Sequence, residues 1–247
     1  MLDFLKNHPF AVESHFDTSL VLTYAVPKEQ LQKYIPECLT LDIFEDKWAF
    51  VAVAMVKTKG LRPKGFPGFS GSDFVLTGYR IFVKYHTSYD KRLRGLYIIR
   101  SETDKWRMGL LGNVFTHYNY QTTDISFKRS GEIIEVRSAK SDLLVKVEEG
   151  NGEVRLPGKS PFRDWKEARR YAGPLPFTFT YDAKKKEVLI IEGVREDWTP
   201  KPVEVLESKV GFIDSLKLSG VVLANAFVIH DIPYYWKKGR KDKWKQV

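Results

Sequence analysis

The sequence predicts a mainly β protein of the α+β class, and three observations support this prediction. Segments rich in Val, Ile, Phe, Tyr and Thr recur along most of the 247 residues, as is typical of strands. Short connections such as Arg129-Ser130-Gly131 and Asn151-Gly152 are typical of hairpins. The segment 47–57 has apolar residues on both faces of an extended chain, so we expect both faces to be covered. Such a strand favours a barrel wrapped by further elements.

Many segments have the composition of strands. In chain order they are 15–25, 39–44, 47–57, 74–86, 94–101, 117–127, 132–138, 142–148, 176–182, 187–193 and 221–231. No internal repeat or low-complexity segment separates them, which favours one domain. The Gly/Pro-rich loop 65–71 is too short to link domains, and we expect it to act as a flap over one end.

Two or three short helices interrupt the strands. Pro27 suits the first position of a helix that Pro36 stops. Ser160 is a suitable N-cap for a second helix, which Gly173-Pro174 ends. A third, short helix is expected within 103–111, although its glycine lowers helix propensity.

The net charge of +9 raises the question of a polyanionic partner. The last twelve residues contain six Lys or Arg and one Asp, a net +5, which leaves +4 for the first 235 residues. We therefore expect one barrel domain over 1–235 and a basic C-terminal tail over 236–247. A charged terminus is usually solvated and poorly ordered, so nucleic acid is not the expected partner.

Cysteine usage and hydropathy predict a soluble cytoplasmic protein. Cys38 is the single cysteine, so no intramolecular disulfide can form, as is usual in a reducing compartment. The N-terminal residues lack the pattern of a secretory signal. The longest apolar run, 48–56, has nine residues, far below the roughly 20 that span a bilayer, so no membrane partner is expected.

Common catalytic signatures fail on inspection. The segment Gly68-Phe69-Ser70-Gly71-Ser72 ends in serine where a nucleophile elbow needs glycine. The sequence has no GxxxxGK[ST] loop for phosphate, and its five histidines show no HxxxH or HxH spacing. We expect no metal and no cofactor.

A group of polar and aromatic residues in the middle of the chain is the remaining candidate site. Alternation places Arg80 and Lys84 on one face of the strand 74–86, and Tyr118 and Tyr120 on one face of the segment 113–121, with His117 on the other. Tyr97 belongs to the strand between them. If these strands adjoin, an arginine could bind an anion while His and Tyr groups transfer protons. The alternative is a hydrated strand face with Arg80 in a surface ion pair.

Three segments resemble the acetoacetate decarboxylase-like proteins, and most closely their uncharacterised sister branch. VPKEQLQKYIPECLTLDIFEDKWAFVAVAMV resembles the opening of the group, and FVLTGYRIFVKY with RGLYIIRSETDKWRMGLLGNVFTHYNY resembles the central hairpin and helix of that branch. ANAFVIHDIPYYWKKG is similar to a C-terminal strand of the group. The resemblance covers about 10–138 and 176–240 and implies a closed, mostly antiparallel β-barrel with a small-molecule pocket inside.

The sequence departs from these relatives where the decarboxylases keep their Schiff-base lysine. Their aromatic-Gly-Phe-Pro-Lys-Lys stretch aligns with residues 113–120 here, and no lysine lies between Lys105 and Lys128. An amine with a depressed pKa is needed to form the iminium. Lys84 is the remaining candidate, and no cation adjoins it in the sequence. Decarboxylation by the family mechanism is therefore not expected.

The leading hypothesis is a protein that binds a small acidic or carbonyl-bearing metabolite. In it Arg80 holds the anion and His117 and Tyr118 act as acid–base groups, while the further ligand-binding candidates are Lys84, Tyr97, Asn113 and Tyr120. One alternative is a decarboxylase or lyase for a β-keto acid, with Lys84 as the amine. Another is binding of nucleic acid or an anionic surface through the tail. The sequence leaves a homo-oligomer open.

Overall fold

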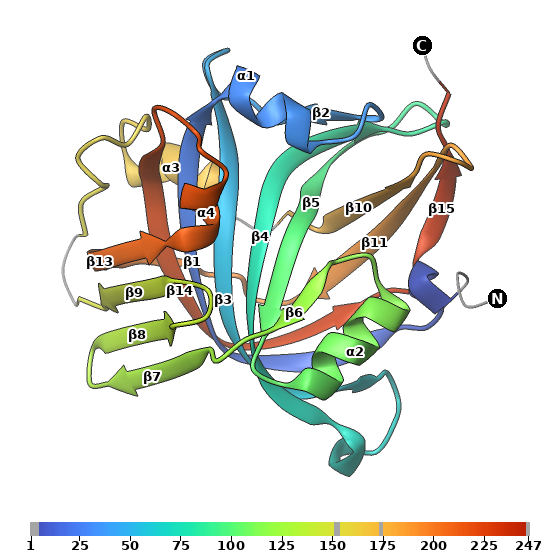
Figure 1. The fold of residues 1–247 in the computed structure, drawn as a ribbon, viewed down its shortest axis with the longest axis horizontal. Coiled ribbons are helices and arrows are strands. Elements are labelled where there is room, and N and C mark those ends of the chain that lie inside the picture. The colour runs from blue at the N-terminus through green and yellow to red at the C-terminus, as the bar shows by residue number, and fades with distance from the viewer. Residues whose placement is uncertain (1–4, 151–153, 173–174, 246–247) are drawn as a thin grey trace.

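The computed structural model describes residues 5–150, 154–172 and 175–245. The Asn151-Gly152 hairpin and the Gly173-Pro174 helix end predicted above lie outside these residues. Strands dominate, and the mainly β class is confirmed. The strands form an eleven-stranded sheet and a separate four-stranded sheet (Figure 1).

The large sheet curves so strongly that its pairings return to their starting strand. β14, β1, β3, β4 and β5 pair antiparallel in that order, β5 pairs parallel with β10, β10 pairs with β11, and β11 pairs with β14. We call these seven strands the ring. Their bounds are β1 Val12–Pro27, β3 Trp48–Pro63, β4 Ser72–His86, β5 Arg92–Thr103, β10 Phe177–Asp182, β11 Glu187–Arg195 and β14 Val222–Trp236.

Four short strands extend the ring at its edges. They are β2 Leu39–Leu41 beside β4, β6 Tyr120–Thr122 beside β5, β12 Lys201–Pro202 beside β14 and β15 Arg240–Lys243 beside β11. The four-stranded sheet has the order β13 Glu204–Val210, β9 Leu143–Glu148, β8 Ile133–Ser138 and β7 Ser126–Ser130. It lies at the left of Figure 1, and its apolar face packs against the outside of the ring.

Alternation along the strands gives the ring two buried faces. On β3, Val51, Val53 and Met55 pack into the core shared with the four-stranded sheet, whereas Ala52 and Ala54 face the opposite side. All residues from Ala49 to Val56 are buried. The prediction that this strand is covered on both faces is therefore confirmed, because other elements pack against each side.

The helices are short, and two predicted boundaries need correction. α1 (Lys28–Leu31) continues as the 3₁₀ turn η2 (Gln32–Tyr34). α3 spans Trp165–Ala172, so Ser160 is not its N-cap; the Asp164 Oδ1 accepts a hydrogen bond from the Glu167 amide instead. The third helix, α2, spans Trp106–Phe115 rather than 103–111. The remaining helical turns are η1 Leu5–Asn7, η3 Gly68–Ser70 and α4 Gly211–Ser215.

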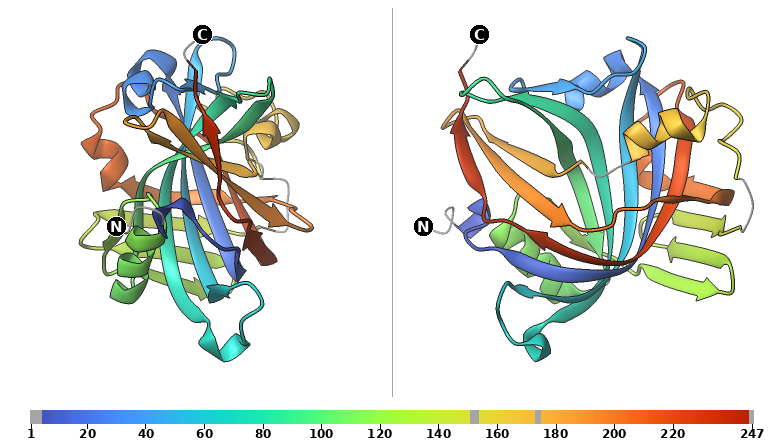
Figure 2. Two further views of the ribbon diagram at one scale, coloured as in Figure 1. Left: turned by 90° about the vertical axis from the view of Figure 1, so that its right-hand side faces the viewer. Right: turned by 180° about the vertical axis from the view of Figure 1, so that it is seen from behind.

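The predicted strand 117–127 was wrong as one element. Residues 117–119 precede β6, and Asn119 there has a φ of 49°, which interrupts an extended chain. Residues 123–125 then separate β6 from β7. The connection between β3 and β4, residues 64–71, projects from the body in every view of Figures 1 and 2.

The basic C-terminal segment is largely integrated into the ring. β14 continues to Trp236, and β15 pairs with β11. Lys237 lies 2.8 Å from Glu192, and Lys241 and Lys243 both approach Glu187. The expectation of a poorly ordered end therefore does not describe residues 240–243. Within the described part of the chain, no helix is long and apolar enough to cross a membrane.

Candidate functional site

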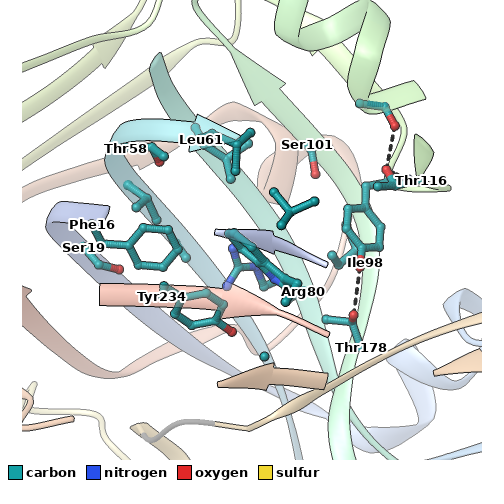
Figure 3. A pocket seen from close by; sticks show the side chains of 18 of the residues that line it. Phe16, Ser19, Thr58, Leu61, Arg80, Ile98, Ser101, Thr116, Thr178 and Tyr234 are labelled. Carbon is teal, nitrogen blue, oxygen red and sulfur yellow. Dashed lines mark hydrogen bonds between the residues drawn. The ribbon is translucent and has the colours of Figure 1, made fainter. Parts of the chain in front are cut away.

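A cavity of about 760 Å³ lies within the ring (Figure 3). All seven strands of the ring and α2 contribute to its lining. This volume falls in the range typical of sites for organic ligands. The walls are mainly apolar, with contributions from Phe16, Ala52, Ala54, Val56, Leu76, Phe82, Leu96, Ile98 and Phe227. They come from the strand faces opposite the core that the ring shares with the four-stranded sheet.

One end of the cavity opens to solvent. Every lining residue with an exposed side chain comes from three segments, namely Phe10, the start of β4 at Ser72 and Asp73, and the α2 region at Lys105, Trp106, Arg107 and Leu111. Phe10 contacts the ring of Phe115 on α2 edge-on. We call this end the mouth.

Arg80 on β4 lies well inside the mouth, and its charge is unbalanced. Its Nε is buried and has no hydrogen-bond partner among the described residues. Burial lowers the pKa of its guanidinium, and the phenols of Tyr234, Tyr120 and Tyr118 oppose that shift. A Cβ on Gly78 would lie 2.9 Å from the Arg80 Nε, so this glycine leaves room for the guanidinium.

A second arginine, Arg195 on β11, also lines the cavity and was missed by the sequence reasoning. Its Nη1 donates a hydrogen bond to the Tyr234 Oη at 3.0 Å, and its guanidinium lies 4.7 Å from the ring centroid of Trp198. Burial lowers the pKa of Arg195; Tyr234 opposes the shift, whereas the positive charge of Arg80 adds to it. The two arginines are therefore near enough to repel each other.

Two tyrosines complete the polar part of the lining. The Tyr118 Oη shares a hydrogen bond of 2.8 Å with the Thr178 Oγ1 (Figure 3). Burial raises the pKa of Tyr118 above its ordinary value and that of Tyr120 to about 12. Both phenols are therefore protonated at neutral pH and can donate hydrogen bonds.

Asn113 positions Tyr120 without lining the cavity itself. Its Nδ2 donates to the carbonyl oxygen of Tyr120 at 2.9 Å, and its Oδ1 accepts from the Tyr120 amide at 2.8 Å. These two bonds connect α2 to β6. Gly112, one residue earlier, packs so closely on the Tyr120 ring that a Cβ would lie 2.4 Å from it.

The structure brings some of the predicted site residues together and separates others. Arg80, Tyr118 and Tyr120 line the cavity, whereas His117 and Tyr97 line a separate space of about 310 Å³ near Phe212. β4, β5 and β6 adjoin as the hypothesis required, but His117 and Tyr118 lie in the bend between α2 and β6 and face different spaces.

Lysines are scarce around this site. Lys84 lies outside the cavity lining and forms an ion pair of 2.8 Å with Asp42. Lys105 is the one lysine among the described lining residues; it is exposed at the mouth, 3.4 Å from Asp104. Over the described ranges, no group of three or more His, Cys, Asp or Glu side chains could hold a metal ion.

Comparison with known proteins agrees with the sequence resemblance. The family model DUF2071, described as an uncharacterized conserved protein, matches residues 14–233. The chain belongs to this family. No curated protein matches it.

Solved structures of acetoacetate decarboxylase-like proteins share the fold of this DUF2071 protein, as the sequence resemblance predicted. An acetoacetate decarboxylase from Legionella pneumophila is 10% identical with a TM-score of 0.61, covering 94% of this chain and 87% of the other. An acetoacetate decarboxylase-like enzyme from Sphingomonas wittichii is 11% identical with a TM-score of 0.58, covering 98% and 94%.

A third solved structure is the enduracididine biosynthesis enzyme MppR in complex with pyruvate. It is 10% identical to the DUF2071 protein with a TM-score of 0.53, covering 94% of this chain and 90% of the other. At these identities the likeness establishes the fold alone.

Proposed function

We propose that this protein binds a small organic acid inside the ring, with Arg80 at the anionic group. The observation that supports this most is a cation in an apolar cavity with no carboxylate beside it among the described residues. A charge in such a place costs free energy unless it is paired. An acidic ligand would supply the missing partner through a charge-assisted hydrogen bond.

The tyrosines would complete the recognition of that acid. Tyr118 and Tyr120 line the cavity as protonated phenols, and both lie near Arg80. They are suited to donate hydrogen bonds to a carboxylate or a carbonyl oxygen. The proposal assigns no acid–base role to His117, because it lines the other space.

Schiff-base decarboxylation is not part of the proposal. The mechanism needs an amine inside the cavity, kept uncharged by burial or by a neighbouring cation. Lys105 is exposed and next to an acid, and Lys84 is paired with Asp42. The relative that carries pyruvate supports a small carbonyl acid as a ligand, without an activity being transferred.

Two further expectations from the sequence, a closed barrel and a cytoplasmic location, belong to the proposal. The pairing of β11 with β14 supports a closed β-barrel around the ligand, and the cytoplasmic location stays a prediction. A nucleic-acid role for the C-terminal segment has little support, because Lys237, Lys241 and Lys243 already lie beside Glu192 and Glu187.

Calorimetric titration with keto acids and aromatic acids tests the binding. We expect Arg80→Met to weaken binding about 10- to 100-fold, because a hydrogen bond to a charged group is lost. Arg92→Met is the matched control, since Arg92 is exposed on β5. Equal affinities in the two variants, or no binding by any acid, would contradict the proposal.

Borohydride trapping tests the exclusion of Schiff-base chemistry. The protein is incubated with a β-keto acid and reductant, and its intact mass is measured. We expect no adduct, whereas an acetoacetate decarboxylase treated in parallel gives one. A stoichiometric adduct that disappears in Lys84→Ala or Lys105→Ala would show that an amine reacts after all.

A further inference from the structure

We infer that the ligand is an amphipathic carboxylic acid whose carboxylate lies between Arg80 and Arg195 and whose apolar body extends along the cavity to the mouth. The inference rests on the proposed function and adds the class of acid. It is argued from the charge balance of the lining, the character of the walls and the exposed side chains at the mouth.

The inner part of the cavity has two cations and no anion among the described lining residues. Arg80 and Arg195 both line it, and Asp73, exposed at the mouth, is the single acidic residue of the described lining. Two arginines that repel each other are both stabilised by one carboxylate placed between them, because guanidinium and carboxylate geometries match. The indole Nε1 of Trp198 is also buried without a hydrogen-bond partner among the described residues.

Tyr234 lies next to both arginines. Its Oη accepts the hydrogen bond from Arg195, and its ring lies beside Arg80 in Figure 3, where its phenol favours the positive charge of Arg80. Gly193 permits this arrangement, since a Cβ there would lie 1.9 Å from the Tyr234 Oη. The head-group site is therefore built from β4, β11 and β14, including the pair of strands that completes the ring.

The rest of the cavity is far larger than a short keto acid requires. Ser72 at the mouth and Arg80 are eight residues apart on β4, about 26 Å along an extended strand. Between them the walls are formed by Val56, Leu61, Phe74 and Leu76, with Phe115 opposite on α2. An apolar ligand body removes these walls from water, which is the main source of affinity in such a site.

The mouth exposes apolar side chains that a ligand tail would cover. Of the eight large apolar residues exposed in the described chain, four lie in the segments that form the mouth, namely Phe10, Trp106, Leu110 and Leu111. Phe10, Trp106 and Leu111 also line the cavity. Exposed apolar clusters of this kind mark binding sites, and their position gives the direction of the tail.

A series of straight-chain acids of increasing length tests the inference. Butanoate, octanoate and dodecanoate are titrated below their micelle concentrations, and the fluorescence of the protein is recorded, because Trp198 and Trp236 line the cavity. We expect roughly three- to fourfold tighter binding for each added methylene that is buried. Dodecanol is the matched ligand without the carboxylate, and we expect it to bind at least tenfold more weakly than dodecanoate.

Variants separate the two ends of the ligand. Arg195→Met should weaken every acid about tenfold or more, whereas the exposed Arg92→Met should weaken none. Val56→Phe narrows the cavity between Arg80 and the mouth, so it should weaken dodecanoate and leave butanoate unchanged. Leu76→Trp repeats this test from β4, and thermal melting verifies that each variant is folded.

The outcomes distinguish this inference from the proposed function. If all acids bind with equal affinity and Arg80→Met still weakens them, acid binding stands and the amphipathic class is overturned. Tighter binding of succinate than of octanoate would also overturn it, because two arginines can hold a dicarboxylate. If Arg80→Met and Arg195→Met leave the affinity of every acid unchanged while longer chains still bind more tightly, the tails bind without the head-group site and the inference fails. If no acid binds, both proposals fail.

Discussion

Lys84 and Arg80 lie four residues apart on β4, but their surroundings differ. Lys84 and Arg94 both contact the carboxylate of Asp42, whose side chain is 3% exposed, at 2.8 and 2.6 Å. Arg80 and Arg195 have phenols and an indole around them and no acidic partner among the described residues. We call a cluster neutralised when a carboxylate contacts its cations. Removing that carboxylate is strongly destabilising, whereas an unneutralised cluster in a cavity costs stability and is retained where a ligand supplies the anion.

The largest expected effect comes from removing the carboxylate of the neutralised cluster. Asp42→Ala leaves Lys84 and Arg94 facing each other and should lower the free energy of unfolding by about 3 kcal/mol. Urea unfolding measures it, with the affinity for acids unchanged in the folded protein. Asp46→Ala, which removes an exposed partner of Lys28, should cost less than about 1 kcal/mol. Equal losses of stability in Asp42→Ala and Asp46→Ala would show that Asp42 contributes no more than an exposed ion-pair partner does.

Gly193→Ala tests the close packing that sustains the unneutralised cluster. The added methyl group would lie 1.9 Å from the Tyr234 Oη, so Tyr234 and Arg195 must move, at a cost of about 2 kcal/mol of stability. Acid binding should weaken together with stability. Gly158→Ala is the control, because nothing lies within 4 Å of a Cβ there. An unchanged affinity in Gly193→Ala would argue against the paired-arginine site.

Asp242 on β15 is a further buried carboxylate, and its contribution to the free energy of unfolding depends on pH. Burial by itself would raise its pKa, but hydrogen bonds from Ser88 and Tyr85 outweigh burial and lower the pKa below the ordinary value of 3.8. A carboxylate with a depressed pKa stabilises the fold above the unfolded pKa, and the contribution is lost as pH falls through the folded pKa.

Asp242→Asn should therefore cost about 1–2 kcal/mol at pH 7. The difference from the unaltered protein should shrink below about pH 4, where Asp242 takes up its proton. Urea unfolding at several pH values measures both quantities. A difference that stays constant down to pH 2 would show that the charge of Asp242 contributes nothing to stability.

The smallest expected change in the free energy of unfolding is an increase rather than a decrease. Arg80→Met removes a partly buried cation that has no acidic partner among the described residues, so the free energy of unfolding should rise by about 1 kcal/mol. Thermal melting without ligand measures this gain, and the same variant loses acid binding. A loss of stability comparable to that of Asp42→Ala would show that Arg80 is structural.

The strands and part of the site could be predicted because their signals are local. Period-two alternation placed Tyr118 and Tyr120 on one face, and both line the cavity with Arg80. The segment 47–57 was apolar on both faces, and its residues 49–56 are buried on both. The single strand predicted over 117–127 failed because neither the left-handed backbone at Asn119 nor the break at 123–125 between β6 and β7 is visible in residue composition.

Arg195 and Tyr234, which belong to the head-group site, could not be predicted from local sequence patterns. Arg195 and Tyr234 meet through the pairing of β11 with β14, across 39 residues of sequence, and the pairing of strands far apart in the chain has no local signal. The nearest hint was the Tyr234-Tyr235-Trp236 run in the C-terminal strand. Lys84 was on the predicted face of β4, but Asp42 removes it from the candidates.

The sequence by itself determined the mainly β class, the resemblance to the acetoacetate decarboxylase-like fold and the absence of a lysine between 105 and 128. These depend on composition, spacing and residue identity. The tertiary structure decided which cations are neutralised, because Asp42 contacts Lys84, while the described residues place phenols and an indole, and no carboxylate, around the two arginines of the cavity. Charge neutralisation depends on distances of a few ångströms between segments far apart in the chain, so the net charge of +9 cannot reveal where an anion is missing.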